Sequence, residues 1–324
     1  MKKRIRMVLI WIVILTALII FFKQSNTYIQ SVINQLLCNI ILVLGLNFIT
    51  GLTGQMNLAT AGMLALGAYT YGILTTSAGW NPWVALLAMF AVGLAVGRGL
   101  GYPSLRLKGF YLSLTTIGFA EIVRLLATNL TDLTGGVNGL NYIRRLETFF
   151  YKSEVKNDYF MLLLAFTVLA ILVAYKIVNS KWGRAYKAIR DNMEAAEASG
   201  IDISKIKIQA FTLSSIYSAI AGALYAGFNM YINPTSFTVA ASQNYVAMLM
   251  IGGIGSVPGN ILGATIVTVL PELLRKYQDY YWILFCTICL VMAILVPDGI
   301  YPLLKKTVLW LKKKLVKKSA AGEG

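Results

Sequence analysis

Carboxylates that could do chemistry are concentrated in one polar segment, residues 181–203. They are Asp191, Glu194, Glu197 and Asp202. Oxygen ligands of this kind hold Mg²⁺ when several are grouped, and membrane enzymes that transfer prenyl or phosphatidyl groups need such a group. These four acids lie among basic residues and do not make such a group, so we expect no metal site. A lipid-modifying membrane enzyme is therefore the weakest of three functions that the sequence allows.

Missing residue types exclude several other kinds of chemistry. The chain contains no histidine, which excludes Ser–His–Asp triads, His-Glu-x-x-His zinc sites and histidine-ligated haem. It contains no Gly-x4-Gly-Lys-Ser/Thr loop, so we expect no ATP site on this chain. Cys38, Cys286 and Cys289 lie in apolar blocks, without disulfide or zinc spacing. We therefore expect no cofactor on this chain and no enzymatic activity of its own.

The composition predicts a membrane protein. Of 324 residues, 57% are hydrophobic and 13% are charged, whereas a soluble domain has about 25% charged residues. The apolar residues form blocks near the length of about 20 residues that crosses a bilayer. We expect an all-α polytopic fold of about eight to ten transmembrane helices. The apolar blocks cover approximately 7–22, 32–50, 60–77, 83–100, 109–127, 159–178, 208–230, 244–256, 260–274 and 280–297.

The two ends of the chain are predicted to contact the membrane within one transmembrane domain, residues 1–318. Residues 7–22 could be a signal peptide, but no cleavage site follows them, which favours a retained first span. Residues 302–318 place lysines opposite an apolar stripe, which predicts a basic helix lying on membrane lipid. Residues 319–324 are expected to be a disordered tail. Residues 244–274 are either two spans or one broken unit, because proline and glycine interrupt them.

The basic residues indicate an orientation rather than a nucleic-acid partner. The net charge is +16, but no basic groove carries the interleaved aromatic residues of a single-strand binder. If the N-terminus is inside, residues 98–108, 176–207 and the C-terminal end also face the cytoplasm. This side then holds 21 of the 29 basic residues, as the positive-inside rule predicts. We expect both termini in the cytoplasm.

Small residues within the spans predict close packing and, at one place, a pathway. Glycines recur every four residues from Gly93 to Gly101 and from Gly255 to Gly263, a spacing that lets helix backbones approach closely. Gly54, Gln55 and Asn57 precede an apolar block, and buried amides must find partners. A polar, glycine-broken helix start is tolerated at membrane depth where it lines a cavity or is buried in protein. These three residues are candidates for the translocation pathway.

Glu121 is a further pathway candidate, because it is the one carboxylate well inside a predicted span. Charges inside a membrane are costly and often mark a pathway. Arg124 follows three residues later on the same helix face. The simpler interpretation is that the two side chains neutralise each other.

Three motifs occur in the order and spacing of a known family of membrane proteins. They are Gly51-Leu52-Thr53-Gly54-Gln55-Met56-Asn57-Leu58, the run from Gly183-Arg184-Ala185 to Glu194-Ala195-Ala196-x3-Gly200, and Gly252-Gly253-Ile254-Gly255-Ser256-Val257-Pro258-Gly259. Together they resemble the LivM-type permease subunits of branched-chain amino acid ABC importers. The stretch from Asn57 to Gly62 departs from the family, which more often has Ser-Leu-Gly-His-Ala there. Branched-chain amino acids are the expected substrates, and other amino acids or urea-like solutes are alternatives.

The resemblance implies a hetero-oligomeric importer in the bacterial cytoplasmic membrane. This subunit would form half of the pathway beside a LivH-like second permease and would receive solute from an extracytoplasmic binding protein. Two cytoplasmic ATPases would bind the ATP and Mg. The resemblance assigns the contact with them to a coupling helix–turn–helix at 179–207, with Gly183, Arg184, Arg190, Glu194, Ala195, Ala196, Glu197 and Gly200 as its site residues.

The residues of this loop predict a short helix independently of the resemblance. Alanine-rich sequence from Ala185 to Ala198 has high helix propensity, Gly200 suits a left-handed cap, and Asp202 or Ser204 suits the start of another helix. Alternatively, the loop is merely solvated, with an i,i+4 pair between Arg190 and Glu194. An ion-gradient-driven carrier of small polar solutes is the other possible function, although it gives this polar helix no purpose.

Overall fold

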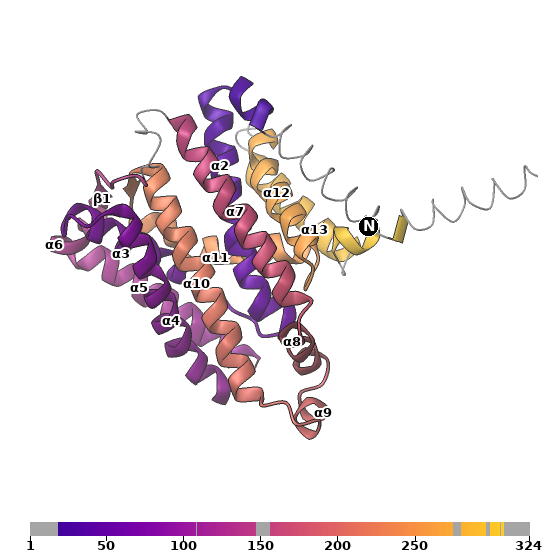
Figure 1. Ribbon diagram of the computed structural model, residues 1–324. Helices are drawn as coiled ribbons and strands as arrows, with labels where there is room; N and C mark the ends of the chain where they lie inside the picture. Colours follow the sequence, from indigo (N-terminus) through magenta and orange to yellow (C-terminus); the bar gives the residue numbers. More distant parts are fainter. Residues whose placement is uncertain are drawn as a thin grey trace, which may run out of the picture.

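The computed structural model describes residues 19–107, 109–146, 156–274, 280–295, 299–304 and 306–307. It is almost entirely helical (Figure 1). The longer elements are α2 (Thr27–Leu46), the π-helix η1 (Asn47–Leu52), α3 (Thr60–Thr76), α4 (Pro82–Arg106), α5 (Phe110–Asn129), α7 (Lys156–Val178), α8 (Lys181–Asp191), α9 (Met193–Ala198), α10 (Ile203–Asn229), α11 (Val239–Gly252), α12 (Val257–Leu274) and α13 (Tyr281–Leu295).

The short elements lie at one end of the molecule. They are α6 (Thr131–Thr134), η2 (Gly136–Asn138), β1 (Leu140–Asn141), β2 (Tyr231–Ile232) and η3 (Pro234–Phe237). The two strands pair antiparallel, with Leu140 opposite Ile232. Since β2 directly follows α10, this pairing marks the end of the molecule at which α10 finishes.

Six described helices are long and apolar enough to cross a membrane, which confirms the all-α polytopic class. They cover Thr27–Leu52, Pro82–Arg106, Phe110–Asn129, Tyr159–Val178, Ile203–Asn229 and Val257–Leu274. Three further predicted spans are shorter helices, α3 with 17 residues, α11 with 14 and α13 with 15. Most of the predicted span at 7–22 lies outside the described residues, although residues 19–22 are helical. The tail at 319–324 and most of the predicted helix at 302–318 also lie outside them.

One predicted boundary is wrong, and the two alternatives left open for residues 244–274 can be compared with the structure. Residues 98–106 are not a loop, because α4 continues through them to Arg106; the glycine at position 101 packs against Ile208 of α10 instead of ending the helix. The unit at 244–274 is one long helix and one short one, divided at 253–256. A helix of 14 residues such as α11 is about 21 Å long, less than the roughly 30 Å of a hydrocarbon core.

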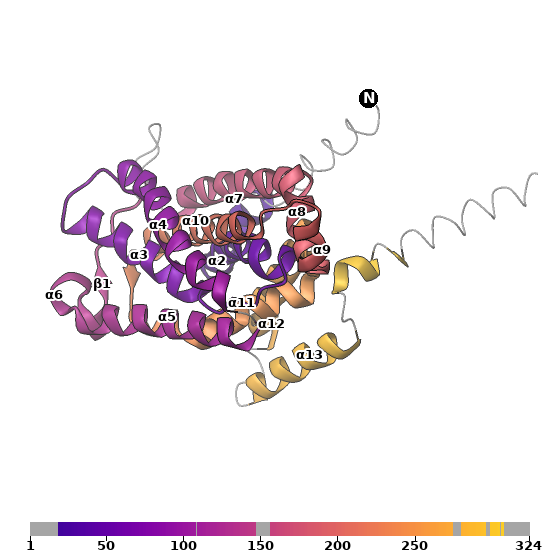
Figure 2. The ribbon, with the colours of Figure 1, turned by 90° about the horizontal axis from the view of Figure 1, so that it is seen from below.

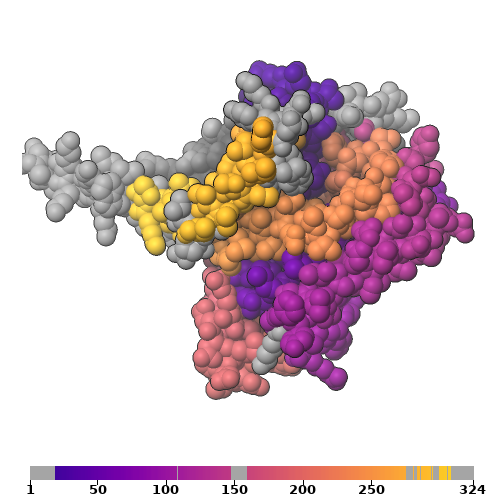
Figure 3. Space-filling view, turned by 180° about the vertical axis from the view of Figure 1, so that it is seen from behind, coloured from indigo at the N-terminus to yellow at the C-terminus, as the bar shows by residue number. Residues whose placement is uncertain are grey.

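Helices α2 and α10 form the centre of the described fold. In their spans, 78% and 72% of the most apolar window is buried, against 28–39% in the other four. Helix α10 contacts α2, α3 and α4, and α2 also contacts α7, α11 and α12. Figure 2 shows α2 and α10 surrounded by these helices. Seen from behind, in Figure 3, α8 and α9 (rose) project beyond the bundle at one end.

The glycines spaced by four do allow backbones to approach closely. A Cβ on Gly97 would lie 2.4 Å from the Cα of Thr212 in α10, and a Cβ on Gly93 would lie 2.6 Å from the Cα of Ile216. In the other pair of helices, a Cβ on Gly263 would lie 1.9 Å from the carbonyl oxygen of Met248. These contacts hold α4 against α10 and α12 against α11 with no room for a methyl group.

This packing predicts different effects for two glycines of the same helix. Gly97→Ala should lower the free energy of unfolding by about 1–3 kcal/mol, because the α4 and α10 backbones must move apart. Gly99→Ala is the matched control, since no atom lies within 4 Å of its Cβ position, and it should be neutral or stabilising by up to about 1 kcal/mol. Thermal unfolding of the purified protein in detergent measures both. Equal midpoints for the two variants would contradict the packing.

Candidate coupling and translocation site

The polar segment forms two short helices joined at a bend, rather than one helix over 185–198 as predicted. Asn192 has extended backbone (φ −157°, ψ 111°). Its side-chain oxygen accepts a hydrogen bond from the Ala195 N–H at 3.0 Å, so it ends α8 and caps α9. Asparagine competes for backbone hydrogen bonds in this way, which propensity alone does not reveal. We call α8, α9 and the turn that follows, residues 181–202, the elbow.

The turn after α9 matches its prediction. Gly200 adopts a left-handed conformation with φ +80°, and Asp202 caps α10 by accepting from the Lys205 N–H at 3.0 Å. The side chain of Lys205 also bonds to this carboxyl and, with that N–H, holds the pKa of Asp202 below its usual range. The spanning helix α10 therefore begins directly at the elbow.

The residues predicted to contact the ATPases divide into an outward and an inward set. Arg184, Glu194, Ala195, Glu197 and Gly200 are exposed, whereas Gly183 and Ala196 are buried. A Cβ on Gly183 would lie 2.1 Å from the carbonyl oxygen of Val178, so this glycine allows α8 to fold back on the end of α7. The exposed set offers two carboxylates beside a small side chain on a surface that a second protein can approach.

Arg190 does not pair with Glu194 among the described residues. Its Nη1 donates a hydrogen bond to the carbonyl oxygen of Gly51, in η1, at 2.8 Å. Gly54, with φ +71°, lies beside the same side chain, and a Cβ there would be 3.2 Å from the Arg190 Cγ. The arginine thus anchors the elbow to the irregular end of α2.

Asn47 attaches a third segment to the same place. Its Oδ1 accepts a hydrogen bond from the N–H of Gly255 at 2.9 Å. A Cβ on Gly51 would lie 1.9 Å from this oxygen, so only glycine leaves room for the bond. We call Asn47, Gly51, Gly54, Arg190 and Gly255 the glycine junction. Each of the three motifs found in the sequence contributes to it.

The predicted pathway segment before α3 lies inside the protein. Asn57 is fully buried, and its Oδ1 accepts from the Ala59 N–H at 3.0 Å. Two further N–H groups at this helix start donate hydrogen bonds to side chains of other helices, Leu58 to the hydroxyl of Thr116 in α5 at 3.1 Å and Ala61 to the hydroxyl of Ser242 in α11 at 3.0 Å. The first residues of α3 are thus held between α5 and α11.

Several amide atoms of this segment lack a partner. Both polar atoms of the buried Gln55 side chain and the Nδ2 of Asn57 make no hydrogen bond among the described residues. An unsatisfied buried polar group costs about 1–3 kcal/mol. Such atoms are available to water or solute, so Gln55 and Asn57 stay pathway candidates; Gly54 belongs to the junction and is exposed.

Glu121 is paired at the surface of α5. Arg124 donates to both carboxylate oxygens, from Nε at 3.1 and 3.0 Å, and also from Nη2. The side chain of Glu121 is 39% exposed and that of Arg124 is 28% exposed. The neighbouring Ile122 and Leu125 are exposed as well. The pair faces outward from the described helices, as the simpler interpretation requires. A role of Glu121 in the pathway stays a prediction.

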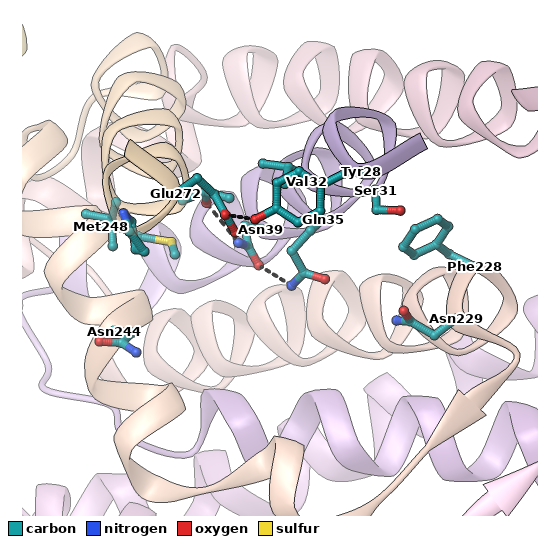
Figure 4. Close-up of a pocket in the computed structure, with 13 residues that line it drawn as sticks. Tyr28, Ser31, Val32, Gln35, Asn39, Phe228, Asn229, Asn244, Met248 and Glu272 are labelled. Carbon is teal, nitrogen blue, oxygen red and sulfur yellow. Dashed lines mark hydrogen bonds between the residues drawn. The ribbon is translucent and has the colours of Figure 1, made fainter. Parts of the chain in front are cut away.

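A cavity of about 410 Å³ with both polar and apolar walls lies between α2, α10, α11 and α12 (Figure 4). Its walls carry Tyr28, Ser31, Val32, Gln35, Asn39, Phe228, Asn229, Asn244, Met248, Val267, Thr268, Pro271 and Glu272. The Nε2 of Gln35 donates to Asn39 at 3.3 Å, and the Nδ2 of Asn39 donates to Thr268 at 2.9 Å. The hydroxyl of Tyr28 donates to the carboxylate of Glu272. These bonds join α2 to α12 across the cavity.

This cavity was not predicted, although the sequence contains a signal for it. Tyr28, Ser31, Gln35 and Asn39 recur at spacings of three and four residues, which places them on one face of a helix. A polar face on an apolar span indicates a buried contact or a cavity. Glu272 also lies within a predicted span, but close to its end, where a carboxylate is less costly and therefore a weaker indication of function.

Comparisons with known proteins agree with the motifs. The family described as "Branched-chain amino acid transport system / permease component" matches residues 28–296. The high-affinity branched-chain amino acid permease LivM of Salmonella typhimurium is 34% identical over 287 residues, which cover 82% of this chain and 68% of the relative. LivM of Escherichia coli is 33% identical over 307 residues, 88% of this chain and 71% of the relative.

A more distant relative is named for the import of a different solute. The autoinducer 2 import permease LsrC of Yersinia pseudotuberculosis is 27% identical over 271 residues, 80% of this chain and 74% of the relative. No solved structure matches the chain significantly.

The glycine junction predicts that two arginines of α8 differ in their effect on stability. Arg190→Ala should lower the free energy of unfolding by about 1 kcal/mol, because the Gly51 carbonyl loses its donor. Arg184→Ala is the matched control on the same helix, since the Arg184 side chain makes no hydrogen bond or ion pair among the described residues, and should change stability little. Thermal unfolding of the purified subunit compares them. An unchanged midpoint for Arg190→Ala would show that its hydrogen bond is not an anchor.

Proposed function

Because this chain belongs to the family of permease components of branched-chain amino acid transport systems, we propose that it forms half of the translocation pathway for these amino acids in an ATP-driven importer. It is a multi-pass protein of the inner membrane. The observation that carries the proposal is the glycine junction. There, Arg190 of the exposed elbow bonds to η1, which joins α2 to the segment before α3, and Asn47 of η1 bonds to the segment before α12.

The partners in this proposal are a LivH-like second permease, two cytoplasmic ATPases and an extracytoplasmic binding protein. The elbow faces the cytoplasm, together with both termini, since the basic residues are concentrated on that side. ATP and Mg²⁺ are bound by the ATPases. This chain converts their movement into a change of access to the pathway.

The elbow suits this coupling role in its shape and charge. Glu194 and Glu197 are exposed on α9, where they can accept hydrogen bonds from a partner, and the small side chain of Ala195 permits close contact. A displacement of α9 is transmitted to α8 across the bend at Asn192, and from α8 to η1 through the hydrogen bond of Arg190. Single turns of π-helix are frequent at functional sites, because they interrupt an otherwise regular helix.

Affinity purification of the tagged chain from its native membrane in mild detergent tests this architecture. Recovery of two P-loop ATPases and a second hydrophobic subunit is the expected result. Recovery of the chain alone from several mild detergents would instead favour the ion-gradient-driven carrier. Uptake by the reconstituted complex with its binding protein then identifies the solute among branched-chain amino acids, other amino acids and urea-like compounds.

The coupling role predicts that Glu194→Lys and Gly200→Pro abolish substrate-stimulated ATP hydrolysis while the protein still inserts and assembles. The first variant reverses a charge that meets the ATPase. The second cannot adopt φ +80° and lacks the N–H that bonds to Glu197. Rates of ATP hydrolysis by the reconstituted complex measure the effect.

Asp202→Asn serves as the matched control for this experiment. It removes a negative charge from the same elbow but retains the side-chain oxygen that caps α10. This variant should hydrolyse ATP at the normal stimulated rate. If Glu194→Lys and Gly200→Pro also did so, α9 would not be the coupling element.

A further inference from the structure

We propose that the cavity between α2, α10, α11 and α12 is a solute-binding site that recognises the ammonium group of an amino acid through the carboxylate of Glu272. This inference rests on the proposed function and assigns its substrate class to particular side chains. The cavity volume of about 410 Å³ lies in the range of small-molecule sites, roughly 300–1,000 Å³.

The location of the cavity suits the arrival of solute from outside. It lies where α2 begins, where α10 ends at Asn229 and where α12 ends. The elbow adjoins the other end of α10, and a helix of 27 residues is about 40 Å long. Figure 1 shows α8 and α9 at the end of the bundle opposite the beginning of α2. With the elbow in the cytoplasm, the cavity opens toward the binding protein.

The cavity also reaches into the membrane. Asn39 is the thirteenth residue of the 26-residue span Thr27–Leu52, so it lies at the middle of this span. Glu272 and Tyr28 lie near the ends of their helices, at the mouth, whereas the bonded amides of Gln35 and Asn39 form the floor with Thr268. A solute that enters therefore meets the carboxylate before it meets the amides.

The charge of the lining favours a cationic group. Among the described lining residues, Glu272 is the single carboxylate and there is no lysine or arginine. The last residue of α10, Asn229, adds the carbonyl end of a helix, which carries about half a negative charge. A Mg²⁺ or Ca²⁺ ion prefers several oxygen anions, and the described residues contain no group of three or more potential acidic, histidine or cysteine ligands.

The remaining walls fit the other parts of an amino acid. Val32, Met248 and Val267 supply apolar surface for a branched side chain, and the amides of Asn229 and Asn244 supply donors for a carboxylate. In Figure 4 these two amides lie apart from the chain of hydrogen bonds between Gln35 and Asn39. A neutral zwitterion with an apolar side chain therefore matches the cavity better than a sugar or an inorganic ion.

A competition experiment on the unaltered complex tests this assignment. Radiolabelled leucine is dialysed against the nucleotide-free importer complex without its binding protein. Isoamylamine, which keeps the ammonium group but lacks the carboxylate, should compete, whereas 4-methylpentanoate, which lacks the ammonium group, should not. Competition by 4-methylpentanoate as strong as that by isoamylamine would overturn the proposal, as would the absence of leucine binding.

Variants then locate the site. Glu272→Gln should weaken leucine binding and lower uptake by at least about tenfold, since hydrogen bonds to charged groups are worth about 1.5–3 kcal/mol, and Glu272→Asp should retain part of both. Asp132→Asn is the matched control, because Asp132 is an exposed acid of α6, at the same end of the molecule and outside the cavity. Uptake by Glu272→Gln equal to that of Asp132→Asn would exclude Glu272 as the recognition group.

The rate of ATP hydrolysis, measured in the same proteoliposomes, separates the two proposals. Glu272→Gln should retain stimulation by the loaded binding protein, because the elbow and the glycine junction are unaltered. If this variant showed both stimulated hydrolysis and normal uptake, the assignment of the cavity would be refuted, but the proposed importer function would not. If the unaltered complex showed no ATPase partner at all, the proposed function itself would fail.

Discussion

The described structure depends on one constraint, the need of irregular backbone inside a membrane to find hydrogen-bond partners within the protein. Helix α2 ends in a π-helix, and α11 is separated from α12 by a glycine-rich break. The guanidinium of Arg190 bonds to the first of these interruptions, and the side chain of Asn47 bonds the first to the second. At these two interruptions of helical geometry, a neighbouring segment supplies a hydrogen-bond partner. Because one of those segments is the elbow, the constraint also fixes the elbow to the membrane helices.

Close glycine contacts join other helices in pairs. Helix α4 packs on α10 through Gly93 and Gly97, and α12 packs on α11 through Gly263, without space for a methyl group. Interiors packed so closely transmit displacement rather than absorb it. Contacts of this kind make each pair move as one body. The polar contacts between α2 and α12 are made by single side chains rather than by close-packed backbones, so we expect a change of access to cost least there.

The sequence allowed the fold class and the loop motifs to be predicted, because apolar blocks and glycine spacing are local signals. It did not allow the junction to be predicted, since the contact of Arg190 with Gly51 joins residues far apart in the chain. The bend at Asn192 was missed because alanines on both sides favour a continuous helix, and tertiary contact and capping override that preference. The cavity was missed for a similar reason, since Glu272 becomes notable only when the polar face of α2 is placed beside it.

Helix α2 connects the two ends of the molecule. It is bonded to α12 by Asn39 and Thr268 at the cavity floor, and Asn47 bonds it to the residues just before α12 at the junction, each at 2.9 Å. The two asparagines are eight residues apart, about 12 Å along a helix. If α12 is rigid, a tilt against α2 that lengthens one of these hydrogen bonds also strains the other. Under the two proposals above, α2 links the cavity to the elbow, through the bond of Asn39 at the cavity floor and the bonds of Asn47 and Arg190 at the junction, so that occupancy at one end would bias geometry at the other.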